Sequence, residues 1–198
     1  MSRIERPKTY EILPQRLQYL PVHGGRIPRD TPTTHYFSID NTLVYWPFFL
    51  DFGPLNLGQL YRFCEQLNAK LADPKLAGKT IVYISDSHAN KRANAVYLIT
   101  AFSLLYLGKT PAEAWAPFAS MFPPLPSWHD ASPVLCTYQL GVQDCLDALQ
   151  KAKDLNFFNF EKFDVRTTQL NPSGPSPASR RPPAAPACPL LRLPHTAC

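Results

Sequence analysis

The sequence has no apolar segment long enough to span a membrane. The longest candidate, residues 93–107, is too short for a transmembrane helix and contains Asn94, Thr100 and Ser103. The N-terminus also has no signal peptide. From these absences we expect no membrane association and an intracellular protein.

The cysteines lack the spacing of a structural framework. They are odd in number and no two form a Cys-x-x-Cys pair; they stand at positions 64, 136, 145, 188 and 198. Without a signal peptide, this pattern is typical of reduced thiols in an intracellular protein. Cys64 lies on the apolar stripe of a predicted helix, so we expect a small core residue there. We also expect no cofactor and no metal site.

Acidic residues are missing from the last part of the chain. Between Arg166 and Cys198 there are four arginines and no acid, so the rest of the chain carries +1, five minus four. A near-neutral body does not predict nucleic-acid binding. Proline becomes frequent beyond Val165, with Ser, Ala and Arg between. This composition predicts a disordered Pro-rich tail over residues 166–198.

The length and composition favour one globular domain with appendages. The chain has 198 residues, of which 45% are hydrophobic. We expect a partly ordered N-terminal extension over residues 1–33, with one short element at the domain edge between residues 10 and 20. The domain itself is expected over residues 34–165.

Hydrophobic patterning predicts alternating strands and helices in this domain. Strands are expected at residues 36–39, 43–45 and 81–84, with Asp40 and Asn41 forming a hairpin turn between the first two. Helices are expected at residues 56–71, 92–107 and 137–153. A further helix starts at Thr110, where Glu113 completes a capping box, and it is cut at Pro117.

The segment between Lys79 and Gly108 is predicted to form a strand, a polar loop and a buried helix. A loop that leads onto a helix N-terminus favours an anion, because backbone N–H groups are unpaired there. Cysteine-dependent phosphatases place Cys at the head of such a loop and Arg six residues later. The sequence therefore offers either generic scaffold or a degenerate phosphate loop consisting of Asp86, Ser87, His88, Ala89, Asn90, Lys91 and Arg92.

Catalytic chemistry is missing from this loop. Asp86 stands where the nucleophile belongs, and the loop has no glycine that would let successive amides turn inward. No cysteine in the chain is followed six residues later by Arg. We therefore predict no catalytic residue.

Two other sites are weaker candidates. Residues 38–42 resemble the Asp-x-Asp-x-Thr motif of haloacid-dehalogenase-type phosphatases, but Ser38 replaces the nucleophile, and a hairpin turn is the alternative. His129 and Asp130 form either a catalytic pair or a loop hydrogen bond. The loop is favoured, because adjacent residues rarely hold each other in catalytic geometry. Asp130 is also the one candidate for a general acid.

Aromatic residues gather at the end of the domain. Phe157, Phe158, Phe160 and Phe163 need a surface to pack on. We expect some of them to be exposed, and we expect self-association through Phe158 and Phe163.

A run of motifs between residues 34 and 165 carries a family resemblance. The motifs are THYFSID at 34–40, LVY at 43–45, DFGPLN at 51–56, KRANA at 91–95, KTPxEA at 109–114, DCL at 144–146 and FExFDV at 160–165. In this order and spacing they resemble the N-terminal domain of the cell-division-cycle dual-specificity phosphatases of the mitotic-exit ("fourteen") family.

The resemblance implies an α/β fold, a degenerate dual-specificity phosphatase domain with a mixed, mainly parallel sheet flanked by helices. It also implies two tandem domains. The first, matched here, is non-catalytic and helps shape the substrate groove. The second removes phosphate from Ser-Pro sites made by cyclin-dependent kinases. The implied partners are phosphoprotein substrates or a phosphatase catalytic domain. The implied location of the protein is the nucleus and cytoplasm, including the spindle or centrosome.

The sequence departs from that pattern after Val165, where the catalytic domain is expected and a Pro-rich tail stands instead. The leading interpretation is a substrate-docking or regulatory domain of a dual-specificity phosphatase. The alternative is a truncated interaction protein, an isoform or a gene-model fragment, that competes for phosphatase substrates or partners.

Overall fold

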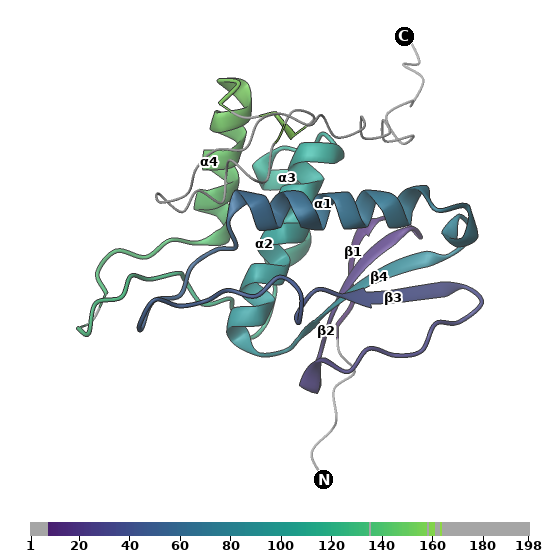
Figure 1. Ribbon diagram of the computed structural model, residues 1–198, viewed down its shortest axis with the longest axis horizontal. Coiled ribbons are helices and arrows are strands. Elements are labelled where there is room, and N and C mark those ends of the chain that lie inside the picture. The colour runs from purple at the N-terminus through teal and green to yellow at the C-terminus, as the bar shows by residue number, and fades with distance from the viewer. Residues whose placement is uncertain (1–7, 135, 158, 161–162, 164–198) are drawn as a thin grey trace, which may run out of the picture.

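The computed structural model describes residues 8–134, 136–157, 159–160 and 163, and Figure 1 shows its ribbon. Four strands form one sheet in the order β1-β2-β4-β3: β1 (Tyr10–Leu13), β2 (Leu17–Val22), β3 (Thr34–Ser38) and β4 (Thr80–Asp86). Strands β2 and β3 run parallel to β4, and β1 runs antiparallel to β2. The predicted mixed, mainly parallel sheet is confirmed.

In the part of the chain that the structure describes, four helices accompany the sheet: α1 (Leu57–Ala72), α2 (Ala89–Tyr106), α3 (Pro111–Trp115) and α4 (Val142–Asp154). Three short 3-10 turns are η1 (His23–Gly25), η2 (Pro74–Leu76) and η3 (Ala116–Phe118). Helix α2 packs against α1, α3, α4 and β4, and all residues from 92 to 104 are buried. The prediction of a helix enclosed in the core is confirmed. Within the described residues, no helix has both the length and the apolar composition needed to cross a membrane.

The core is centred on Tyr83 in β4. Its ring lies 5.6 Å from that of Tyr19 in β2, 5.2 Å from Phe37 in β3 and 5.0 Å from Phe63 in α1. Each of these four side chains is at most 5% exposed. Fully burying one such ring contributes about 2–3 kcal/mol. Phe63 thereby fixes helix α1 against the sheet, on the face that carries the Tyr83 ring.

The N-terminal segment differs from the prediction of one short element at the domain edge. Two strands form there, and β2 lies inside the sheet, between β1 and β4. The turn between them uses Gln15, whose φ of 57° is left-handed. Arg16 then donates hydrogen bonds to the carbonyl oxygens of Leu71, in the last turn of α1, and Leu76, in η2. This long-range anchor explains why local patterning understates the segment.

The predicted hairpin at residues 36–45 is wrong. Strand β3 ends at Ser38, and residues 43–45 form no strand. The amides of Thr42 and Leu43 both donate to the carbonyl oxygen of Ile39, so the chain curls into a turn. Strand β3 pairs instead with β4, in parallel, and α1 forms the crossover between the two strands.

Helix starts are partly as predicted. Asn56 caps α1 and Thr110 caps α3, each in a capping box with the residue three positions later. Helix α4 begins at Val142 rather than residue 137, because Leu140 pairs through its backbone with Trp128. Tyr138, which lies inside the range predicted for that helix, is 73% exposed. The predicted disordered tail, residues 166–198, lies outside the described residues.

Candidate functional site

The candidate phosphate loop is shorter than the sequence predicts. Asp86 is the last residue of β4, and α2 begins at Ala89, so only Ser87 and His88 lie between strand and helix. The remaining residues of the predicted loop, 89–92, form the first turn of α2. A wide loop whose amides encircle a phosphate is therefore not present at this junction.

Carboxylates of the chain itself accept the backbone N–H groups at the junction. The amide of Asp86 donates to Asp40 Oδ2 over 2.6 Å, and the amide of His88 donates to Asp86 Oδ1 over 2.9 Å. Asp40 reaches the site from the turn after β3, 46 positions earlier in the chain. Two of the donors that a bound anion would use are thus occupied from within.

Asp40 is largely enclosed. Its side chain is 10% exposed, and burial raises the pKa of its carboxyl group, although the hydrogen bond from Asp86 opposes this shift. Lys91 Nζ lies 3.8 Å from Asp40 Oδ2, at the limit of an ion pair, and that lysine is 46% exposed. Such a distant, solvated partner neutralises the buried carboxylate only in part.

Gly25 allows the η1 turn to approach these carboxylates closely. Its φ is +60°, and a Cβ atom placed there would lie 3.4 Å from Asp86 Oδ2 and 3.7 Å from Asp40 Oδ2. The amide of Ser87 donates to the carbonyl oxygen of Val22 at the end of β2. The junction is therefore closed on this side by β2 and η1.

Arg92, predicted to close the phosphate loop, points to a different part of the chain. Its guanidinium donates to the carbonyl oxygens of Pro123 at 2.9 Å and Pro124 at 3.4 Å. The side chain is buried, and its Nε makes no hydrogen bond with a described residue. Arg92 thus holds the proline-rich segment against α2 and does not face the Asp86 junction as a phosphate ligand would.

His129 and Asp130 form loop contacts, as the sequence favours. His129 Nδ1 lies 3.1 Å from the Asp130 carbonyl oxygen, and the Asp130 carboxylate accepts the amide of Ser132. Hydrogen bonds from Ser132 hold the pKa of Asp130 below its usual value. A general acid must keep its proton near neutral pH, so this exposed carboxylate is unsuited to that role.

Two of the described cysteines, Cys64 and Cys145, lack the surroundings of an activated thiol. Cys64 is fully buried in the core, as predicted, and burial raises the pKa of its thiol. Burial also raises the pKa of Cys145, to about 11. A nucleophilic thiol needs the opposite shift. Cys188 and Cys198 lie outside the described residues.

A pocket of about 270 Å³ opens beside the Asp86 junction. Its walls are mainly apolar and include Leu43, Pro47, Phe52 and Leu55, with Asp40, Asp51, His88 and Lys91 as charged or polar lining residues. Asn94 of α2 stabilises one wall, because its side chain accepts the amide of Leu55 and donates to the carbonyl oxygen of Gly53. Sequence reasoning placed Asp40 in a turn and in the weak haloacid-dehalogenase-type motif at residues 38–42, and it missed this pocket.

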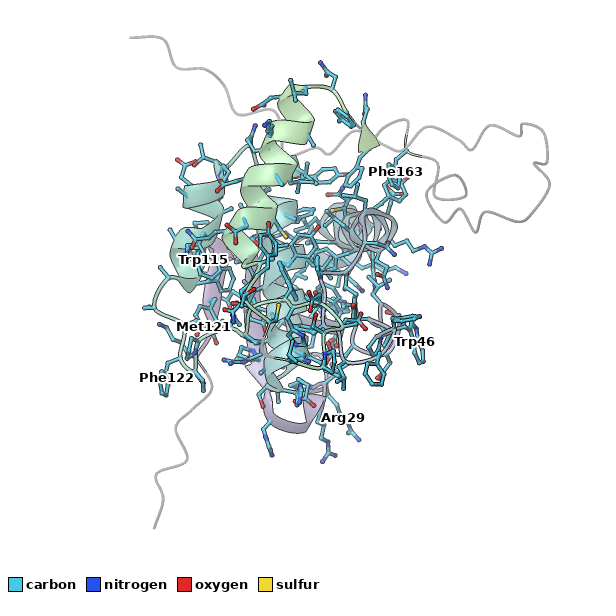
Figure 2. All side chains as sticks on the ribbon, turned by 90° about the vertical axis from the view of Figure 1, so that its left-hand side faces the viewer. Arg29, Trp46, Trp115, Met121, Phe122 and Phe163 are labelled. Carbon is cyan, nitrogen blue, oxygen red and sulfur yellow. The ribbon has the colours of Figure 1, made fainter. Side chains whose placement is uncertain are left out.

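One wall of the pocket carries an exposed apolar tip, residues 46–50, which sequence reasoning also missed. Trp46 is 84% exposed and Phe48 is 93% exposed. Asp51 gives the tip a defined shape, since its carboxylate accepts both the Tyr45 hydroxyl and the amide of Phe49. Figure 2 shows Trp46 at the edge of the molecule, on the side opposite Phe122. The only sequence signal is an apolar run that has no helical or strand period.

The C-terminal aromatic residues divide into two groups. Phe157 is 84% exposed, as expected for part of this cluster. Phe160 and Phe163 pack on Tyr61 of α1, with ring centroids 5.5 and 5.2 Å away. Phe158 lies outside the described residues. Self-association through Phe158 and Phe163 stays a prediction.

Comparison with known proteins gives consistent matches. The family described as "Dual specificity protein phosphatase, N-terminal half" matches residues 11–152, a range that includes β2 and most of β1. Dual specificity protein phosphatase CDC14A of Homo sapiens is 45% identical over 156 residues, which are 78% of this chain and 26% of that protein.

More distant relatives have the same kind of name. Dual specificity protein phosphatase CDC14B of Mus musculus is 36% identical over 138 residues, 70% of this chain and 28% of that protein. Tyrosine-protein phosphatase CDC14 of Saccharomyces cerevisiae is 32% identical over 142 residues, 69% of this chain and 26% of that protein. The chain spans about a quarter of the length of these relatives.

Proposed function

This chain belongs to the family of dual specificity protein phosphatase N-terminal halves, and we propose that it is a non-catalytic substrate-docking or regulatory domain. The phosphatase it would serve acts on phosphoserine-proline sites in cell-cycle control. Its partners would be phosphoprotein substrates or a phosphatase catalytic domain, and its location would be the nucleus and cytoplasm, including the spindle or centrosome.

The observation that supports a non-catalytic role is the internal occupation of the β4–α2 junction. Asp86 stands at the nucleophile position, and the Asp40 carboxylate accepts its amide over 2.6 Å. Arg92 is bonded to Pro123 and Pro124. A phosphate dianion at this junction would meet two carboxylates. Each unit charge pair about 4 Å apart costs roughly 4 kcal/mol at an effective dielectric near 20.

Activity assays of the purified chain test this proposal. The parent and Asp86→Cys are incubated with an aryl phosphate and with phosphoserine-proline peptides, with vanadate as inhibitor control and an active cysteine phosphatase as positive control. We expect no turnover from either protein. Vanadate-sensitive turnover by the parent would contradict the non-catalytic role. Turnover by Asp86→Cys alone would show that only the nucleophile is missing.

The exposed tip at residues 46–50 favours a second candidate, an interaction protein that competes for phosphatase substrates or partners. Four large apolar residues are exposed there, with only Pro47 between them: Trp46, Phe48, Phe49 and Leu50. Such a patch is uncommon on a monomer surface and indicates a contact surface. A competition assay tests this: the chain is added to a dual specificity phosphatase acting on a protein substrate. A fall in rate that is lost in Trp46→Ser, Phe48→Ser would support competition.

A further inference from the structure

The pocket beside the junction contains a buried carboxylate with one unused oxygen. Asp40 Oδ2 accepts the Asp86 amide, whereas Oδ1 accepts no hydrogen bond from a described residue. Oδ1 is also absent from the enclosed polar atoms that lack a partner, so it keeps access to the space outside the protein, and Asp40 lines the pocket. A nine-tenths buried carboxylate with a free acceptor favours a ligand that brings a donor.

The surroundings of this carboxylate are short of positive charge. Asp51 lines the same pocket, and Asp86 adjoins Asp40 directly. Lys91 is the cation near Asp40 among the described residues that line the pocket, and it is 3.8 Å away and half exposed. Two carboxylates and one lysine thus line the pocket, and a third carboxylate adjoins Asp40. A cationic ligand would complement this charge.

The walls specify the rest of the ligand. Leu43, Pro47, Phe52 and Leu55 offer apolar contact to a long side-chain stem. Beside the pocket mouth, the tip at residues 46–50 presents Trp46, Phe48 and Phe49, each at least 65% exposed. The Asp51 hydrogen bonds keep this surface in one shape before any ligand arrives, which lowers the entropy lost on binding. An arginine flanked by large apolar residues combines both requirements.

One segment of the chain outside the described residues has this composition. Residues 166–198 contain four arginines and no acid, and only Arg192 is flanked by leucines, at positions 190, 191 and 193. Arg180 and Arg181 stand among Ser and Pro. We propose that residues 190–193 dock on this site in the same chain, with the Arg192 guanidinium on the Asp40 and Asp51 carboxylates and the leucines on the tip.

The intervening chain is long enough. Phe163 is the last described residue, and 28 residues separate it from Arg192. A flexible chain of that length has a typical end-to-end distance of about 30 Å and a maximum near 90 Å. A tethered ligand of this kind has a local concentration on the order of millimolar, so weak contacts suffice for docking. This inference goes beyond the proposed function, because docking of residues 190–193 does not depend on whether the chain is a docking domain or an interaction protein.

Hydrogen–deuterium exchange of the full chain tests the proposal. The variants are Arg192→Glu and a matched control, Arg180→Glu, which makes the same charge change away from the leucines. On the body, Asp40→Asn removes the pocket charge and keeps an acceptor for the Asp86 amide, and Asp147→Asn on the exposed face of α4 is its control. Residues 43–52 report the site.

We expect Arg192→Glu and Asp40→Asn to accelerate exchange at residues 43–52 by about fivefold, which corresponds to about 1 kcal/mol of docking. Arg180→Glu and Asp147→Asn should leave exchange unchanged. Equal exchange in Arg192→Glu and Arg180→Glu would overturn the proposal. Protection that rises with protein concentration would also overturn it, because a second copy would then be the occupant.

Discussion

The two ends of β4 are stabilised by side chains of opposite charge. At the N-terminal end, Arg16 donates to the carbonyl oxygens of Leu71, Leu76 and Lys79. At the C-terminal end, the carboxylates of Asp40 and Asp86 accept backbone amides. A helix C-terminus leaves carbonyl groups unpaired and a helix N-terminus leaves N–H groups unpaired, so each end attracts the complementary charge.

If the chain is non-catalytic, as we propose, this difference explains how a phosphatase-like frame loses its phosphate site and keeps its fold. The end that offers carbonyl groups has no ligand to bind and is satisfied by an arginine. The end that offers N–H groups is where an anion binds in cysteine-dependent phosphatases. Here the chain's own carboxylates accept two of these N–H groups, and in the proposed non-catalytic role they take the place of the phosphate.

We expect the largest effect on stability from removing the arginine side chain at the N-terminal end of β4. Arg16→Ala should lower the free energy of unfolding by about 3 kcal/mol, because it deletes charge-assisted hydrogen bonds to three carbonyl groups from one partly exposed side chain. Urea denaturation measures this. Arg62→Ala on the exposed face of α1 is the control and should change stability by less than about 0.5 kcal/mol. Equal effects of the two variants would refute the anchoring role.

Removing the carboxylate at the other end should cost less. Asp40→Ala leaves the amide of Asp86 without its acceptor, so we expect a loss of about 2 kcal/mol in unfolding free energy. Asp40→Asn keeps an oxygen acceptor and should change stability by less than about 1 kcal/mol. The comparison uses urea denaturation near neutral pH. If Asp40→Ala is as stable as Asp40→Asn, the hydrogen bond is not what stabilises this end.

The middle of β4 provides a case in which a buried polar group has no described partner. The Tyr83 hydroxyl makes no hydrogen bond with a described residue, whereas the Tyr19 hydroxyl lies 2.7 Å from Ser85 Oγ. Tyr83→Phe should raise the free energy of unfolding by about 1 kcal/mol, and Tyr19→Phe should lower it by a similar amount. Thermal and urea unfolding of the pair provide the measurement. The same sign for both variants would show that packing decides instead.

The smallest effect concerns pH. Burial raises the pKa of Asp40 in the folded state above its ordinary 3.8. Between the ordinary and the raised pKa, the folded state therefore binds more protons than the unfolded state. The contribution of Asp40 to stability therefore falls as pH rises through that window. Asparagine does not titrate, so the stability of the parent relative to Asp40→Asn should fall as pH rises above 3.8. A difference that is independent of pH would show that Asp40 keeps its ordinary pKa.

Local signals in the sequence predict much of the fold. The α1 stripe of Leu60, Cys64 and Leu67 is buried as expected, and the capping box predicted at Thr110 forms. The buried helix α2 and the short strand before it are also found. These elements depend on residues three or four positions apart, which periodicity can detect.

What the sequence does not predict depends on distant residues. Asp40 meets Asp86 across 46 positions, and Arg92 meets the proline segment across 31. No periodicity connects such pairs, so the polar run at residues 85–91 predicts a loop, although residues 85–86 end β4 and residues 89–91 begin α2. The predicted strand at residues 43–45 fails for the same reason, because Gln59 of α1 donates to the Val44 carbonyl oxygen and the Tyr45 hydroxyl donates to Asp51.

The Asp40 carboxylate can be regarded as a tethered competitor. A dianion that reaches the junction gains its amide only in molecules whose carboxylate has moved away, so its apparent dissociation constant is divided by that fraction. If the bonded form is favoured by about 1.4 kcal/mol, the fraction is about one tenth and binding weakens about tenfold. Since the competitor cannot be diluted, changes in protein concentration leave this exclusion unchanged.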